Sequence, residues 1–169
     1  MATTRTKTVS DETQAEKKPV AKKVDPHQYV VVRNGFQGRL VYRSKRTGEL
    51  YVWEEFGAEQ DIELQELKNA KNSAKKFFVN NWFLFDEDWI IDYLGVRQFY
   101  RYSLTIDNFD DVFTKTPEEI VEIVGRLSEG QKRSVAYRAR QLIADGEIDS
   151  NKAIAALEKS LGIELVERV

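Results

Sequence analysis

The sequence predicts an α+β protein in which a small antiparallel β unit with covering helices precedes a C-terminal bundle of three helices. Between residues 29 and 64, short runs rich in valine, tyrosine and tryptophan alternate with glycine-containing turns, which is typical of hairpin strands. In the last third, capping residues and glycines delimit three amphipathic segments. With 169 residues, 41% of them hydrophobic, the chain is long enough for one domain or two small ones.

The composition divides the chain into three parts: an arm over residues 1–26, an α+β domain over 27–113 and a helical domain over 114–169. The arm has no aromatic residue, so it cannot bury enough apolar surface to offset the entropy lost on ordering. Its six basic and four acidic residues give it a net charge of +2. It is either a solubilising tail or an arm that orders along a partner, with contacts from Lys17, Lys18, Lys22 and Lys23.

The β unit is expected to be an antiparallel meander, which could close towards an SH3-like barrel. A hairpin alone is marginally stable, so these strands need one another and a covering helix. Gly48 supplies the positive φ that a tight turn requires between the second strand and the third. The expected strands cover residues 29–33, 40–44, 50–53 and, as a short fourth strand, 61–64.

Covering elements follow the meander. Apolar residues at three-to-four spacing predict a helix over residues 65–78, and the aromatic run 82–85 reads as a buried extended segment. A second helix begins at the acidic residues 86–88 and ends at Gly95. Residues 97–113 are expected to be an irregular connector, and the core is expected to contain Trp53, Trp82 and Trp89.

Three helices are predicted in the C-terminal part from their end signals. Thr116 is an N-cap, with Glu119 at the capping-box position and Pro117 at the first helical position. Ser128 caps the second helix, which carries Val135, Ala139, Leu142 and Ile143 on its apolar face and ends at Gly146. Asp149 or Ser150 caps the third helix, which ends at Gly162. Apolar stripes of this width bury one another in a bundle.

No catalytic, cofactor or metal motif is recognisable, so we expect a protein that is not an enzyme and has no cofactor. There is no cysteine, and the single histidine, His27, is expected to be solvated. The acidic clusters 86–88 and 107–111 lack EF-hand spacing, and helix-start carboxylates explain them. No apolar run approaches the roughly 20 residues of a membrane span. The net charge of −2 argues against coating nucleic acid throughout but permits a local basic patch.

The second of these helices, residues 131–144, offers the best binding surface. At about 100° per residue, Arg133, Tyr137 and Arg140 fall on one side, away from the apolar face. Arginine beside tyrosine suits phosphate contacts, base stacking or a protein interface, and a solvated face remains an equal alternative. With Gly130 in the preceding turn, the arrangement also has the look of a helix-turn-helix.

The predicted hairpin carries a second basic region. Arg39, Arg43, Lys45 and Arg46 lie close in sequence to three aromatic residues, and small barrels bind single strands with this mixture. The favoured interpretation is that the aromatic residues make cross-strand core contacts. These residues are Tyr42, Tyr51 and Trp53.

Several segments resemble small proteins encoded among the structural genes of tailed bacteriophages. The segments are residues 35–42 (GFQGRLVY), 77–82 (FFVNNW) and 134–143 (SVAYRARQLI) through 154–162 (IAALEKSLG). The likeness spans about residues 28–168 and rests on no defining motif, so it transfers no functional residues. It implies a virion component or assembly factor of the head, neck or tail, present in many copies.

The expected function is therefore that of a non-enzymatic structural protein of a phage virion, assembled in the host cytoplasm. Its partners would be other virion proteins, copies of itself, or both, with no membrane. The alternative is a nucleic-acid-binding regulator that uses the basic helix 131–144.

Overall fold

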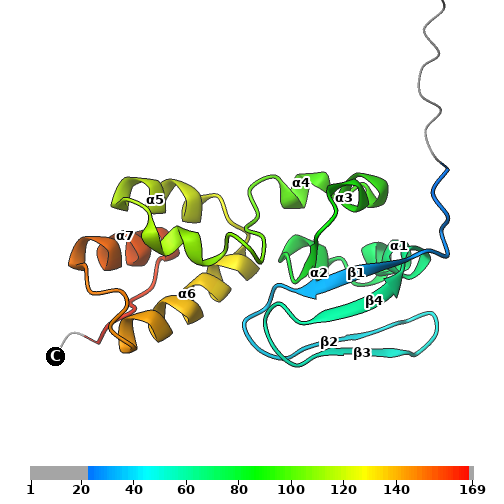
Figure 1. Ribbon diagram of the computed structural model, residues 1–169, viewed down its shortest axis with the longest axis horizontal. Helices are drawn as coiled ribbons and strands as arrows, with labels where there is room; N and C mark the ends of the chain where they lie inside the picture. Colours follow the sequence, from blue (N-terminus) through cyan, green and yellow to red (C-terminus); the bar gives the residue numbers. More distant parts are fainter. Residues whose placement is uncertain (1–22, 168–169) are drawn as a thin grey trace, which may run out of the picture.

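The structure, a computed structural model, describes residues 23–167 (Figure 1). The strands and the first four helices form one half of the elongated molecule, and the last three helices form the other half. The first half contains β1 (Tyr29–Asn34), β2 (Leu40–Arg43), β3 (Leu50–Trp53), β4 (Glu59–Glu63), α1 (Leu64–Ser73), α2 (Lys76–Val79), β5 (Phe83–Phe85), α3 (Asp88–Leu94) and α4 (Arg97–Tyr100). The second contains the short 3₁₀ helix η1 (Asp110–Thr114), α5 (Pro117–Gly125), α6 (Glu129–Ala144) and α7 (Asn151–Leu161).

The α+β class and the antiparallel β unit are confirmed, but the strand pairing differs from the expected meander. β1 is the central strand of a three-stranded sheet, with β4 on one side and β5 on the other. Val32 pairs with Gln60 on one side and with Phe85 on the other. β2 and β3 form a separate hairpin. The two sheets stay separate among the described residues, so the expected closure towards an SH3-like barrel is not seen.

A cluster of aromatic rings fills the core of the first half. Phe83 is fully buried, and its ring centroid lies 4.9 to 5.5 Å from those of Tyr42, Trp53, Phe77 and Phe78. The indole Nε1 of Trp53 donates a hydrogen bond of 2.9 Å to the carbonyl oxygen of Val32, which links the hairpin to the central strand. The expectation of three core tryptophans is correct for Trp53 alone.

The other two tryptophans, Trp82 and Trp89, are half-buried and pack against this core from outside it.

The helices after the hairpin also differ from the prediction. The predicted helix 65–78 is interrupted, because Ala74 leaves the helical conformation between α1 and α2. The predicted irregular connector contains two short helical pieces, α4 and η1. The sequence pattern missed these pieces because four or five residues are too few to show a period.

All three C-terminal helices are present, with the predicted end signals. Thr116 Oγ1 accepts a bond of 3.3 Å from the Glu119 amide, and Glu119 Oε2 accepts one of 2.9 Å from the Thr116 amide. The second bond holds the pKa of Glu119 below its usual value. Ser128 caps α6 through the Gln131 amide, and Ser150, not Asp149, caps α7 through that of Ala153.

These helices share a second hydrophobic cluster with residues that precede them in the chain. Leu104, Phe109 and Val112 are buried in it, and the ring of Phe56, from the loop between β3 and β4, lies 4.8 Å from that of Phe109. The buried residues of the first cluster end at Tyr100, and the half-buried Ile106 also packs against it. Leu104, Phe109 and Val112 thus pack forward onto the bundle, and the division of the chain at residue 113 stays a prediction.

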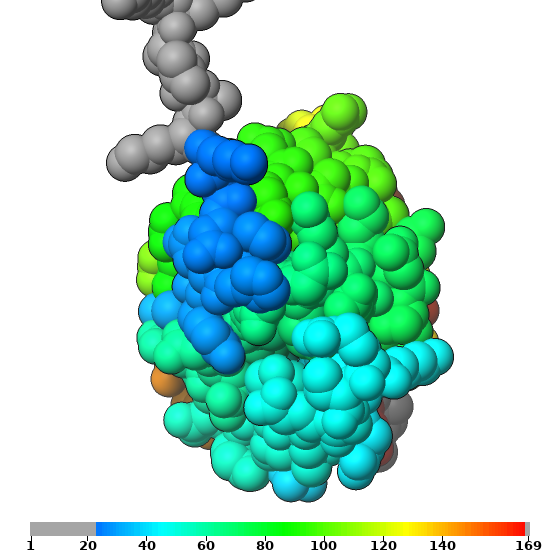
Figure 2. Space-filling view, turned by 90° about the vertical axis from the view of Figure 1, so that its right-hand side faces the viewer, coloured from blue at the N-terminus to red at the C-terminus, as the bar shows by residue number. Residues whose placement is uncertain are grey.

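The end of the predicted arm that the structure describes is attached to the first half. The carbonyl oxygen of Pro26 accepts a bond of 2.8 Å from the Gln65 amide, and Val24 packs against the first cluster. His27 is exposed as expected, and its Nδ1 lies 2.7 Å from Glu63 Oε1. Figure 2 shows this segment (blue) lying on the surface of that end of the molecule. Residues 1–22 of the predicted arm lie outside the described residues.

Candidate functional site: the exposed face of α6

The first turn of α6 is buried where the two halves of the molecule meet. A Cβ atom at Gly130 would lie 2.4 Å from both Cβ and the carbonyl oxygen of Asn80, so only glycine allows this approach. The side chain of the fully buried Gln131 bonds both backbone groups of Leu104, each at 2.8 Å. Ser134 Oγ donates a bond of 3.2 Å to the carbonyl oxygen of Gly35. The start of α6 is therefore fixed to both halves.

This burial bears on the helix-turn-helix interpretation. The sequence suggested that Gly130 belongs to the turn before the helix. In the structure it lies inside α6. In a helix-turn-helix, residues near the start of the second helix contact base edges in the major groove. Here Gly130, Gln131 and Ser134 are covered by protein. These three residues are therefore not available to a DNA groove, whereas Glu129 and Arg133 in the same part of α6 are exposed. The regulator alternative stays a prediction.

The opposite face of α6 is open, and it carries the three predicted binding residues together. Arg133, Tyr137 and Arg140 are all exposed, and Tyr137 leaves 52% of its surface accessible. Arg140 Nη2 donates a bond of 3.2 Å to the carbonyl oxygen of Glu164, so the C-terminal segment runs beside this face. We call Arg133, Tyr137 and Arg140 the α6 face.

The neighbouring Arg138 has a structural role instead. Its Nε and Nη2 atoms bond the two carboxylate oxygens of Asp110 at 3.1 and 2.8 Å. The bond to Asp110 raises the pKa of the Arg138 guanidinium. A bidentate pair of this kind fixes the direction of both side chains. It ties α6 to η1 and keeps this guanidinium away from the α6 face.

Of the four predicted contact lysines of the arm, the structure describes Lys23 alone. Lys17, Lys18 and Lys22 lie outside the described residues, and Lys23 is exposed. Figure 1 shows the first described residues at the end of the molecule away from α6. Lys23 therefore lies on a different surface from the α6 face, and the contact role of the arm stays a prediction.

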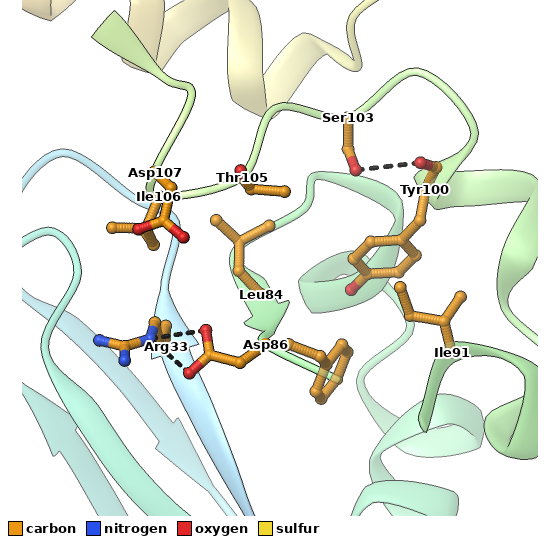
Figure 3. Close-up of a pocket in the computed structure, with 10 residues that line it drawn as sticks. Arg33, Leu84, Asp86, Ile91, Tyr100, Ser103, Thr105, Ile106 and Asp107 are labelled. Atoms are coloured by element: carbon orange, nitrogen blue, oxygen red, sulfur yellow. Dashed lines mark hydrogen bonds and ion pairs between the residues drawn. The ribbon is translucent and has the colours of Figure 1, made fainter. Parts of the chain in front are cut away.

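A cavity of about 210 Å³ lies between the three-stranded sheet and the segment that links the two halves (Figure 3). On one side Arg33 Nε bonds both carboxylate oxygens of Asp86, at 2.7 and 2.8 Å. A second carboxylate, that of Glu59, lies 2.7 Å from Arg33 Nη2. Two acidic partners thus balance this guanidinium, so it offers little attraction to an anionic ligand.

The other side of this cavity contains Tyr100. Burial raises the pKa of its hydroxyl, which donates a bond of 2.7 Å to the carbonyl oxygen of Phe83. Its hydroxyl group is thus used in holding α4 to β5.

Within residues 23–167, no group of three or more His, Asp or Glu side chains is placed to hold a metal ion. The helices described there include none long and apolar enough to cross a membrane.

Sequence reasoning missed one grouping of charges. Lys75 and Lys76, from the start of α2, line a groove together with Arg43 and Lys45 of the hairpin region. The sequence alone shows the basic character of the hairpin residues. The two lysines are about 30 residues further along the chain, so no local pattern could join them to the hairpin.

Comparisons of the chain with protein-family models, with curated proteins and with solved structures find no match.

Proposed function

We propose that this protein is a non-enzymatic structural protein of a bacteriophage virion, a component or assembly factor of the head, neck or tail. It acts through protein–protein contacts in a multi-copy assembly, with copies of itself, other virion proteins or both as partners. The virion setting comes from the resemblance of the sequence. The contact surface comes from the α6 face.

One observation carries the assignment of the contact surface: a half-exposed tyrosine between two exposed arginines on a helix that is fixed on its other side. Tyrosine and arginine are enriched among the residues that dominate the binding energy of protein interfaces. A phenol ring offers a large contact area while losing little conformational entropy. Because Gln131 and Ser134 hold the helix, a partner does not have to order it.

In an assembly of identical copies, one such surface can serve every subunit. In a closed symmetric oligomer each copy makes the same contact, so one favourable face stabilises every interface of the ring or shell. The net charge of −2 leaves little overall repulsion between copies.

The test is the molar mass of the full chain in solution, measured by light scattering over a range of concentrations. We expect a defined oligomer whose dissociation constant increases at least about tenfold in Tyr137→Ala, the typical loss at an important interface residue. Tyr102→Ala is the matched control, because Tyr102 is 51% exposed and Tyr137 is 52% exposed. A monomer at all concentrations, or an equal effect of both variants, would contradict the assignment of the α6 face.

A further inference from the structure

A groove of about 520 Å³ runs between β2 and the junction of α1 with α2, in the half of the molecule that does not contain α6. Its lining includes four cationic side chains and no acidic one. All four are exposed at the surface. They are Arg43, Lys45, Lys75 and Lys76, which we call the basic groove.

The cations of the basic groove are not neutralised within the described part of the chain. None of the four forms an ion pair with a carboxylate there, whereas Arg33, Arg97 and Arg138 each have an acidic partner within 3 Å. The ammonium groups of Lys75 and Lys76 lie 5.4 and 5.7 Å from the ring centroids of Phe99 and Phe77. Such contacts leave the positive charge available to an anion.

The aromatic residues beside the groove are not available for stacking. Tyr42 is 1% exposed and Phe77 is 6% exposed, because both rings pack into the first hydrophobic cluster. Base-stacking proteins require open ring faces. Protein interfaces are commonly centred on exposed aromatic or apolar groups. The basic groove instead offers exposed charge beside covered rings, and Val41, 41% exposed, is the exposed apolar side chain of its lining.

We propose that the basic groove binds the phosphate backbone of a nucleic acid without reading its sequence. Closely spaced cations without base contacts suit a ligand whose negative charges repeat at short intervals. Such a contact would give an acidic virion protein a local attachment to nucleic acid, separate from its contacts with other subunits. It goes beyond the proposed function, and it uses a different surface from the suggested helix 131–144.

The expected signature is a salt dependence set by the number of phosphates contacted. Up to four contacts predict a slope of log affinity against log salt of about −3 to −4 for duplex DNA, and a shallower slope of about −2 to −3 for a single strand. Both ligands share the phosphate chemistry, and the relative affinities distinguish which of them the groove accommodates. Changing the base sequence should leave the affinity unchanged.

The experiment titrates the full chain into fluorescently labelled 20-residue oligonucleotides, single-stranded and duplex, at several salt concentrations from 50 mM upwards. The groove variant is Lys45→Gln with Lys75→Gln and Lys76→Gln. The matched control is Lys115→Gln with Lys152→Gln and Lys159→Gln, which removes the same charge from exposed lysines of the other half. Because all six lysines are exposed, we expect both proteins to fold, and thermal unfolding checks this.

We expect the groove variant to bind at least about thirtyfold more weakly at low salt, with a slope shallower by about 3 on duplex DNA, and the control to stay near wild type. No binding by wild type at 50 mM salt would overturn the proposal, as would equal losses in both variants. Unchanged nucleic-acid binding in the groove variant would also overturn it, and a loss of self-association in that variant would then assign the groove to an acidic protein surface. Light scattering on the same samples measures self-association, which is the property assigned to the α6 face, separately from nucleic-acid binding.

Discussion

Replacing Gly130 by alanine is expected to lower the free energy of unfolding by about 3 kcal/mol, the upper part of the usual range for overpacking. The added Cβ would lie 2.4 Å from the carbonyl oxygen of Asn80, and a backbone atom cannot move aside as a flexible side chain can. Relief requires α6 to move away from the first half, which also disturbs the bonds from Gln131 and Ser134. For a chain of this size, the melting temperature should fall by about 6 to 12 °C.

The matched control for this prediction is Gly125→Ala. Gly125 is the last residue of α5, and a Cβ there meets nothing within 4 Å. Because alanine favours the helical conformation over glycine by about 1 kcal/mol or less near a helix end, this variant should be as stable as wild type or slightly more so. Chemical denaturation of the three proteins makes the comparison. Equal stability of Gly130→Ala and wild type would show that the two halves do not meet closely at this residue.

Replacing Phe83 by alanine is expected to cost about 4 kcal/mol, the range observed for removing a fully buried phenylalanine ring. Phe83 lies on β5, and four neighbouring rings lose their common contact when it is removed. These rings come from β2, β3 and α2, so no single element can move to fill the cavity. Several elements of the first half should therefore lose stability together.

Urea denaturation followed by tryptophan fluorescence measures this effect, since the Trp53 ring lies 5.5 Å from Phe83. Phe83→Leu, which keeps much of the volume, should lose clearly less stability than Phe83→Ala. Tyr102→Ala removes an exposed ring and should stay within about 0.5 kcal/mol of wild type. A loss below about 1 kcal/mol in Phe83→Ala would mean that this ring is not central to the core.

The parts of the fold that the sequence predicted correctly are those set by neighbouring residues. The capping box at Thr116 and the serine cap at Ser128 act over three residues, so reading the chain locally was enough to place α5 and α6. The pairing of β1 with β4 and β5 was not predicted, because strand pairing depends on which distant apolar faces bury each other. The same limit explains Trp82 and Trp89, whose burial depends on neighbours from elsewhere in the chain.

The grouping of residues on the surface depends in the same way on how far apart they lie in the sequence, while the binding role of either surface stays a prediction. The α6 face was predicted because Arg133, Tyr137 and Arg140 share one side of a single helix, and helical periodicity places them together. The basic groove combines residues from the hairpin and from α2, so only the tertiary structure brings its charges into one place. Gly130 was assigned to a turn because glycine commonly breaks helices, whereas here it allows two backbones to approach.

The most direct test of the central claim is to look for this protein in assembled particles. Phage particles would be purified by density gradient from lysates of the cells that produce this protein and washed at high salt. Their proteins would then be measured by quantitative mass spectrometry. Assembly in many copies predicts that the chain is found in the particles at a fixed number of copies relative to the most abundant shell protein. A chain that is present in the lysate but missing from the washed particles would contradict the claim that it is a structural protein of the virion.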